Sequence, residues 1–279
     1  MNGHFVKMQG VGNDFILIDN RRGIWPLDAL HLRRWCDRRL GVGADQLLVL
    51  EETRRPDADF RYRIFNADGG EVEQCGNGAR CMTRWVLERI FPGECVRFET
   101  MRAVIRGSIG KDGLVSVEMG MPILEADDLP FRTDGLSYCG GAWRGFGLSG
   151  TDELCVLAVG NPHAVRFGLM PVDEVFCRTG ERLQDHPAFP EGINFECVCP
   201  RSDSEADFRV WERGVGETPA CGSGACAAAV AGMLTGRFGR TVTFHTGGGI
   251  LRVRRPDPDG PVFLEGPAEY VFEGDLPLD

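Results

Sequence analysis

The feature that most constrains the fold is a short sequence that occurs twice. CGNGAR at 75–80 is similar to CGSGAC at 221–226, so the first cysteines of the two copies lie 146 residues apart, about half of the 279-residue chain. Each copy follows a strand-like run and a turn, and each opens a helix-like run. Similar segments with similar flanks at half-length spacing indicate that one structural unit has been duplicated.

Alternating apolar and polar residues recur along the whole chain, separated by turn-rich segments such as ADGG at 67–70 and TGGG at 246–249. This period of two is typical of half-buried strands. It predicts strands at 60–65, 96–99, 114–119, 155–159, 208–211, 242–245 and 250–253. Helical patterns are fewer: we expect helices over 27–39, over 172–183 and after each repeated cysteine-glycine pair. The pattern is that of a strand-rich α+β fold, without strict βαβ alternation.

Composition and charge exclude several classes of function. The formal net charge is −10, which argues against a nucleic-acid partner and against docking to an anionic membrane. No stretch approaches the roughly 18 apolar residues that a membrane span needs. The N-terminal segment MNGHFVKMQG has no apolar core of a signal peptide. We therefore expect a cytoplasmic protein.

The chain contains 11 cysteines, most of which we interpret as small buried apolar residues. An odd count in a chain of this size, without an export signal, argues against a disulfide scaffold. The spacings Cys75 to Cys81 and Cys221 to Cys226 are C-x5-C and C-x4-C, not paired C-x2-C knuckles. We therefore expect no metal site.

A cysteine at the start of a helix lies at the positive end of the helix dipole, which lowers the pKa of the thiol. The backbone N–H groups that follow, those of Gly76, Asn77, Gly222 and Ser223, can bind an anion such as a carboxylate. The same groups would stabilise the charge that builds on a carboxylate when its α-proton leaves.

Two such sites in one chain point to a specific chemistry. Inversion of a stereocentre by proton transfer needs a base on one face of the carbon and an acid on the other. Cys75 and Cys221, one from each half, would supply that pair, with one cysteine as thiolate and the other as thiol. Cys81 and Cys226 lie inside their helices, and for these two we expect only packing.

At these residues the sequence resembles diaminopimelate epimerase over nearly its whole length. The resemblance rests on separated, ungapped motifs: KMQGVGNDF at 7–15, GVGADQ at 41–46, FNADG at 65–69, QCGNGAR at 74–80, GNPH at 160–163, ERGVGET at 212–218 and ACGSG at 220–224.

The resemblance implies a fold of two pseudo-symmetric lobes, each a curved, mostly antiparallel sheet, an open barrel, around a central helix. It implies an N-terminal lobe of residues 1–121 with 267–279, which carries Cys75, and a C-terminal lobe of residues 122–266, which carries Cys221. It further implies interconversion of LL- and meso-diaminopimelate in lysine and peptidoglycan precursor synthesis, without a cofactor, by a homodimer.

Diaminopimelate has an amino-acid group at each end, so the end that does not react must also be held. The resemblance assigns this task to Arg213, whose planar fork suits a carboxylate, and to further polar groups. These are Asn13, Gln46, Asn66, Asn161, Asn194 and Glu212. His163 and Glu212 correspond to residues that tune the protonation of the cysteines. Two positions depart from the family: Gly192 stands where arginine is common, and Phe272 where some members carry a tyrosine at the dimer contact.

Alternative functions remain open from the sequence. Proline racemase-like enzymes share the two-lobed fold and often the cysteine pair, but do not require a distal clamp such as Glu212 with Arg213. A phenazine-synthesis-type isomerase lacks the paired cysteines. A pyridoxal-phosphate racemase would need a Schiff-base lysine, and the only lysines are Lys7 and Lys111. A thiol redox or metal-binding protein is the alternative from another class.

Overall fold

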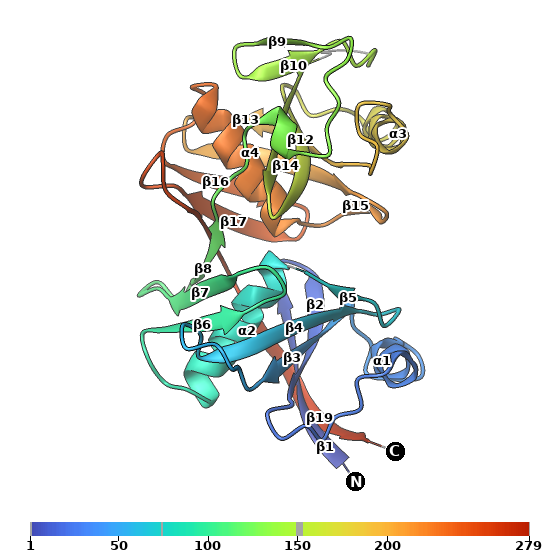
Figure 1. Cartoon of the computed structure of the whole chain (residues 1–279), viewed down its shortest axis with the longest axis vertical. Helices are drawn as coiled ribbons and strands as arrows, with labels where there is room; N and C mark the ends of the chain where they lie inside the picture. The colour runs from blue at the N-terminus through green and yellow to red at the C-terminus, as the bar shows by residue number, and fades with distance from the viewer. Residues whose placement is uncertain (1, 74, 149–152, 279) are drawn as a thin grey trace. The chain divides into compact units, whose positions relative to one another are not determined.

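The computed structural model describes residues 2–73, 75–148 and 153–278, and these divide into two compact units (Figure 1). The first unit comprises Met1–Glu118 with Glu265–Asp279, and the second comprises Met119–Leu264. Gln74 of the QCGNGAR motif lies outside the described residues.

The first unit contains two α-helices and a mixed sheet among its described residues. Its elements are β1 (Asn2–Gly10), β2 (Asn13–Asp19), α1 (Ala29–Cys36), β3 (Gln46–Glu51), β4 (Phe60–Asn66), β5 (Glu71–Val72), α2 (Gly76–Arg89), β6 (Cys95–Glu99), β7 (Val104–Ile109), β8 (Val115–Gly120) and β19 (Glu269–Pro277).

The second unit has the same kind of content within its described part. Its elements are a 3₁₀ turn (Ala126–Asp128), β9 (Ser137–Cys139), β10 (Ala142–Arg144), β11 (Glu153–Val159), β12 (Asn161–Phe167), α3 (Asp173–Gln184), β13 (Asn194–Pro200), β14 (Glu205–Glu212), β15 (Gly216–Thr218), α4 (Gly222–Leu234), β16 (Thr241–Thr246), β17 (Gly249–Arg254) and β18 (Val262–Gly266), the last of which ends in the first unit.

The two units repeat one strand order. In the first, β1-β2-β3-β4-β6-β7 are neighbours, and β2–β3 and β4–β6 are the parallel pairs. In the second, β11-β12-β13-β14-β16-β17 are neighbours, and β12–β13 and β14–β16 are the parallel pairs. The short strands β5 and β15 add to β4 and β14 at the same place in each repeat. The duplicated sequence therefore folds into a duplicated topology, with mostly antiparallel pairs as expected.

The last strand of the chain, β19, pairs antiparallel with β1, so the two termini lie side by side within the first unit (Figure 1). Each unit packs one helix against several of its own strands. α2 contacts β1, β2, β3, β6 and β7, and α4 contacts β11, β12, β13, β16 and β17. In α4 these contacts follow from sequence, because residues 224–232 are Gly, Ala, Cys and Val only and all of them are buried.

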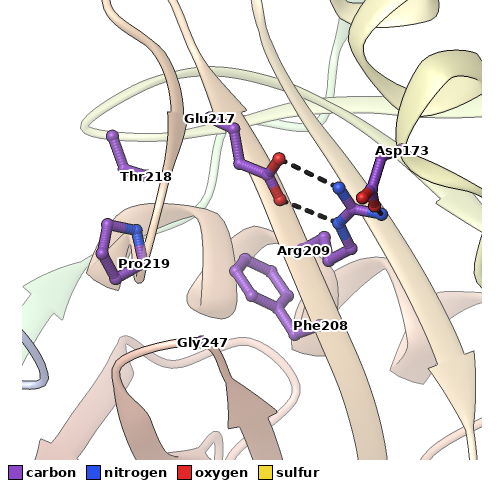
Figure 2. A pocket seen from close by; sticks show the side chains of 7 residues that line it. All are labelled: Asp173, Phe208, Arg209, Glu217, Thr218, Pro219 and Gly247. Atoms are coloured by element: carbon purple, nitrogen blue, oxygen red, sulfur yellow. Dashed lines mark hydrogen bonds and ion pairs between the residues drawn. The ribbon is translucent and has the colours of Figure 1, made fainter.

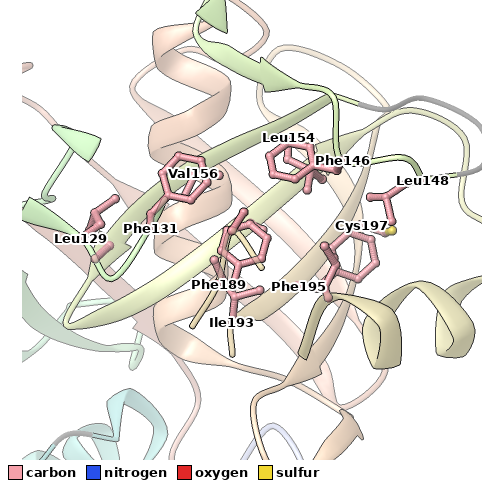
Figure 3. Close-up of a cluster of buried hydrophobic side chains, with 14 of the residues drawn as sticks. Leu129, Phe131, Phe146, Leu148, Leu154, Val156, Phe189, Ile193, Phe195 and Cys197 are labelled. Carbon is pink, nitrogen blue, oxygen red and sulfur yellow. The ribbon is translucent and has the colours of Figure 1, made fainter. Parts of the chain in front are cut away.

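A second layer of side chains covers the opposite face of each sheet. In the first unit, α1 begins at the cap Asp28, whose carboxylate accepts the N–H groups of Leu30 and His31, and buries Leu32 and Trp35 against the sheet. In the second unit, the rings of Phe131, Phe146 and Phe189 stack in a buried cluster (Figure 3), to which α3 contributes Phe176 and Leu183. Among the described residues, no helix has the length and apolarity required to cross a bilayer.

Candidate active site

Cys75 and Cys221 occupy equivalent positions, each directly before the helix packed inside its unit. Cys75 is the N-cap of α2 and Cys221 the N-cap of α4, and both have extended backbone. The Cys75 sulfur accepts the N–H of Gly78 at 3.4 Å. The prediction that each cysteine opens a helix is thus confirmed, and each sulfur lies at the positive end of a helix dipole.

The second glycine of each repeated motif permits a close approach behind the cysteine. A Cβ on Gly78 would lie 2.6 Å from the hydroxyl oxygen of Tyr62. A Cβ on Gly224 would lie 2.7 Å from Oε1 of Glu196. Both distances are too short for a real Cβ contact, so the C-G-x-G pattern reflects the space at the start of each helix.

Two of the predicted asparagines surround Cys75. The Cys75 sulfur lies 3.7 Å from Oδ1 of Asn13, and Nδ2 of Asn77 donates to the same oxygen at 3.4 Å. The guanidinium of Arg80, buried in α2, donates to Oδ1 of Asn77 at 3.0 Å. The side chain of Asn77 is therefore held between Asn13 and Arg80.

Gln46 and Asn66 lie opposite each other on β3 and β4. Nε2 of Gln46 donates to Oδ1 of Asn66 at 2.9 Å, and the buried Oε1 of Gln46 accepts no hydrogen bond from the described residues. A buried amide oxygen without a partner is a ready acceptor for a ligand donor.

Cys221 has a different electrostatic environment from the one that its sequence position predicts. Burial raises the pKa of the Cys221 thiol well above its ordinary value, and the charges of Glu212 and Glu196 raise the pKa further. The hydroxyl of Ser223, 3.4 Å from the sulfur, acts in the opposite direction. The expected lowering of the pKa by the helix terminus is therefore wrong for Cys221, because burial and two carboxylates outweigh it.

His163 and Asn161 form a chain of contacts with a residue that the sequence reasoning missed. Nδ1 of His163 lies 2.6 Å from Oε1 of Glu196, and Nε2 lies 2.9 Å from Oδ1 of Asn161. The side chains of His163 and Glu196 are both fully buried. The alternation of residues along β13 could have indicated Glu196, since it falls on the same face as Asn194.

The side chain of Asn194 links β12 to the turn that begins at Arg213. Its Nδ2 donates to the carbonyl of Pro162 at 2.9 Å, and its Oδ1 accepts the backbone N–H of Arg213 at 2.9 Å. The Arg213 guanidinium donates to the Glu191 carbonyl at 3.1 Å. Gly192 has φ of 70° and packs against the Arg213 stem, which accounts for glycine at this position.

Glu212 directly precedes Arg213 in the chain, but its side chain contacts Thr218. Its Oε1 accepts the hydroxyl of Thr218 at 2.5 Å, across the hairpin of β14 and β15 that leads to Cys221. The predicted site residues therefore form two groups. Asn13, Gln46, Asn66, Cys75, Gly76 and Asn77 belong to the first unit, and Asn161, His163, Asn194, Glu212, Arg213, Cys221, Gly222 and Ser223 to the second.

The second unit also contains a pocket lined by Asp173, Phe208, Arg209, Glu217, Thr218, Pro219 and Gly247 (Figure 2). The Arg209 guanidinium there donates to both carboxylate oxygens of Glu217, at 2.8 and 2.9 Å, and pairs with Asp173 at 3.1 Å. Its charge is thus neutralised within the pocket, so we assign Arg209 a structural role.

Cys81, the second cysteine of the first repeated motif, differs from Cys75 in its surroundings. Cys81 is fully buried, and burial raises the pKa of its thiol to about 12, so it is inert as a nucleophile. Within the described part of the chain, no group of three or more His, Cys, Asp or Glu residues is arranged to hold a metal ion.

Comparison with known proteins gives consistent matches. The sequence model of the diaminopimelate epimerase family matches residues 5–125 and 155–271. The diaminopimelate epimerase of Azotobacter vinelandii is 44% identical, over 98% of this chain and 99% of that protein. That of Aromatoleum aromaticum is 43% identical over the full length of both.

Among solved structures, a hydroxyproline epimerase from Agrobacterium vitis is similar, with a TM-score of 0.67 over 99% of this chain and 91% of that one, at 14% identity. A Bacillus anthracis protein of the PhzF phenazine-biosynthesis family has a TM-score of 0.65 over 99% of both chains, also at 14% identity. At such identity these structures establish the shared fold alone.

Proposed function

Because the chain belongs to the diaminopimelate epimerase family and is therefore an isomerase, we propose that it inverts one α-carbon of diaminopimelate with Cys75 and Cys221 as its acid–base pair. One observation carries the assignment of these two residues. Each is the cap residue of the equivalent helix in two units of the same strand order.

The reaction needs only proton transfers. The thiolate of one cysteine takes the α-proton, the Cα–H bond breaks, and its electron pair is delocalised into the adjacent carboxylate. The thiol of the other cysteine then gives its proton to the opposite face of the carbon. The product is inverted, and the two cysteines have exchanged protonation states.

The helix termini would bind the carboxylate of the reacting end. Backbone N–H groups in the first turn of a helix have no partner inside the helix and carry partial positive charge. We assign this task to Gly76, Asn77, Gly222 and Ser223, which begin α2 and α4. Charge that develops on the carboxylate as the proton leaves would be stabilised there more strongly than the ground state.

The second amino-acid end of the substrate would be held by Arg213 and by a set of neutral side chains. The fork of Arg213 suits the distal carboxylate. Asn13, Gln46, Asn66, Asn161, Asn194 and Glu212 would hold the remaining oxygens and the ammonium groups. Two observations support this assignment: Oε1 of Gln46 has no hydrogen-bond partner in the described part of the chain, and Asn194 accepts the backbone N–H of Arg213.

His163 and Glu212 would tune the protonation of the cysteines. The negative charge of Glu212 acts on the Cys221 thiol and favours its protonated form. We further propose that the enzyme interconverts the LL and meso forms in the cytoplasm, for lysine and peptidoglycan precursor synthesis, without a cofactor.

We also propose that it acts as a homodimer. The strand β19 supports this, because Val271 and Phe272 are 55% and 47% exposed there. Phe272 also stands where some members of the family carry a tyrosine at the dimer contact. Sedimentation of the wild-type protein and of Phe272→Arg tests the oligomeric state. We expect the wild type to be a dimer and the variant to be a monomer, because the introduced arginine charge would disrupt the contact. A monomeric wild type would overturn the proposal.

Activity is tested by incubating the pure protein with LL-diaminopimelate in heavy water without added cofactor. We expect deuterium at one α-carbon and formation of the meso isomer. L-Proline in a parallel reaction serves as the control substrate, and we expect no exchange with it. Deuterium incorporation at the α-carbon of proline, with none in diaminopimelate, would instead support the proline racemase-like alternative.

A further inference from the structure

A buried carboxylate lies beside the cysteine of the second unit and has no role in the mechanism above. Glu196 is on β13, two residues beyond Asn194, and Asn194 is the register partner of His163 on β12. Residues two apart on a strand share a face, so Glu196 and His163 lie on one face of the sheet. Their side chains are fully buried, with Oε1 2.6 Å from Nδ1.

Packing alone does not explain this carboxylate. Its second oxygen, Oε2, is buried and has no hydrogen-bond partner among the described residues. A half-satisfied buried carboxylate is costly, so a residue of this kind points to a function. Burial raises the pKa of Glu196 above its ordinary value, and it outweighs the opposing effects of the His163 charge and hydrogen bond.

The Glu196 carboxylate and the Cys221 side chain both lie close to Gly224. The position of a Cβ on Gly224 is 2.7 Å from Oε1 of Glu196 and 3.3 Å from the Cβ of Cys221. The charged and titratable groups that act on the Cys221 sulfur come from three elements: Glu196 on β13, Glu212 on β14, and the Ser223 hydroxyl on α4. On β12, His163 meets Glu196.

We propose that Glu196 is a positioning residue that keeps Cys221 in its thiol form between turnovers, while it fixes the ring of His163. This inference rests on the proposed function, since a thiol at Cys221 matters only if Cys221 donates a proton. The helix dipole at the start of α4 alone would favour the thiolate. Burial counteracts the dipole, and the negative charges of Glu212 and Glu196 add to the effect of burial.

The proton balance shows why the enzyme would use such a group. When Cys221 gives its proton to the substrate carbon, it becomes a thiolate, and Cys75 has become a thiol. Before the next turnover in the same direction, a proton must return from solvent to Cys221 and another must leave Cys75. A fixed negative charge beside Cys221 favours that return, and it keeps the acid protonated as the pH rises.

The experiment measures the pH dependence of alkylation of Cys221 by iodoacetamide, with peptide mapping to separate the eleven cysteines. Glu196→Gln preserves shape and removes the charge. We expect its alkylation profile to move to lower pH by about one unit, which is roughly tenfold faster labelling at a given pH below the midpoint. The high-pH limb of kcat/KM should move in the same direction.

The same unit offers a matched control. Glu205 contacts His245 at the other end of β14, so Glu205→Gln removes a His–Glu pair of the same kind at a partly exposed site. We expect its profile to coincide with that of the wild type. An unmoved profile in Glu196→Gln, with a wild-type melting temperature, would overturn the proposal.

A second variant covers the case in which Glu196→Gln does not fold. His163→Gln retains the charge of Glu196, so its alkylation profile should stay in place or move to higher pH, and a move to lower pH would contradict the inference. The two proposals are distinguishable. A shifted profile in a protein without epimerase activity defeats only the proposed function, and epimerase activity with an unmoved Glu196→Gln profile defeats only this inference.

Discussion

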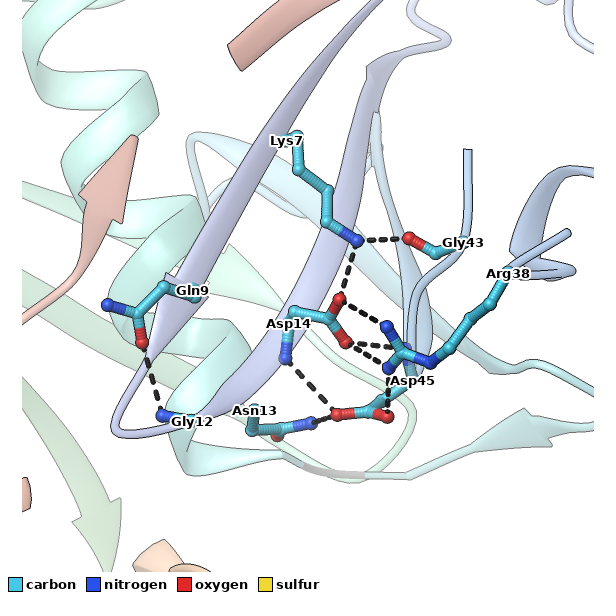
Figure 4. A network of polar contacts seen from close by, with 8 residues as sticks. All are labelled: Lys7, Gln9, Gly12, Asn13, Asp14, Arg38, Gly43 and Asp45. Carbon is cyan, nitrogen blue, oxygen red and sulfur yellow. Dashed lines mark hydrogen bonds and ion pairs between the residues drawn. The ribbon is translucent and has the colours of Figure 1, made fainter. Parts of the chain in front are cut away.

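Asp45 accepts a hydrogen bond from Nδ2 of Asn13 at 2.8 Å (Figure 4), and this bond leaves the Asn13 oxygen available to Cys75. The amide of an asparagine presents a donor on one side and an acceptor on the other. With its donor fixed on Asp45, Asn13 offers an acceptor to the Cys75 sulfur, 3.7 Å away, and to Nδ2 of Asn77. Asp45 thus determines the orientation of a candidate substrate-binding residue.

A network of charges holds Asp45 in place. Arg38 bridges Asp45 and Asp14, and Lys7 pairs with Asp14 at 2.7 Å. Burial raises the pKa of Asp14, but its hydrogen bonds from Arg38 and Lys7 outweigh burial and hold the pKa well below the ordinary value. Asp14 therefore stays charged at neutral pH and keeps its ion pairs with Arg38 and Lys7.

We predict that Asp45→Asn lowers kcat/KM for epimerisation roughly tenfold, because loss of a hydrogen bond to a charged partner costs about 1.5 kcal/mol or more and frees the Asn13 amide to turn. Asp59→Asn, which breaks an exposed pair with Arg97 in the same unit, is the control and should retain full activity. Equal activity in both variants would show that Asp45 does not position Asn13.

Some of this site could be predicted from the sequence. The repeated C-G-x-G pattern predicted a helix after each cysteine, and α2 and α4 begin at Gly76 and Gly222. The strands were predicted to within a few residues from their period of two, as for β4 over Phe60–Asn66. These features are local, so a single segment of sequence carries them.

The groups around the cysteines could not be predicted in the same way. Glu196 meets His163 only because β12 and β13 are parallel in one specific register, and it approaches Cys221 only over the glycine at 224. The pKa of Cys221 likewise depends on burial and on carboxylates from two other strands. Such relationships depend on strand pairing, which the residue pattern of one segment does not encode.

Arg213→Lys preserves charge and removes the planar fork. We predict that KM for LL-diaminopimelate rises about tenfold and that discrimination against the DD isomer weakens, since a lysine cannot hold a carboxylate through two parallel hydrogen bonds. Steady-state kinetics with each isomer measures both effects. Arg201→Lys, at an exposed pair with Asp207, is the matched control. Unchanged KM and selectivity in Arg213→Lys would remove Arg213 from the clamp.

Mild oxidation tests whether the two cysteines can meet. All eleven cysteines are free thiols in the structure. We predict that air oxidation without substrate forms a Cys75–Cys221 disulfide, which requires Cα atoms within about 7 Å, and that activity is lost until a thiol reductant is added. Peptide mapping under non-reducing conditions identifies the bond. A different pair, or no disulfide, would contradict the proposal that these two cysteines flank one substrate carbon.

The central claim is that one cysteine acts on each face of the substrate carbon. The most direct test compares Cys75→Ser and Cys221→Ser, with Cys81→Ser as a buried control. Two reactions are measured for each variant: epimerisation in heavy water, and elimination of halide from a substrate analogue that carries a halogen next to the reacting carbon. We predict that each of the first two variants loses epimerisation by about a hundredfold or more, because a serine hydroxyl is a far weaker acid than a thiol. Each should still eliminate halide from the isomer whose α-proton faces the remaining cysteine, since elimination needs only one base. Wild-type epimerisation in either Cys75→Ser or Cys221→Ser would contradict the two-base account.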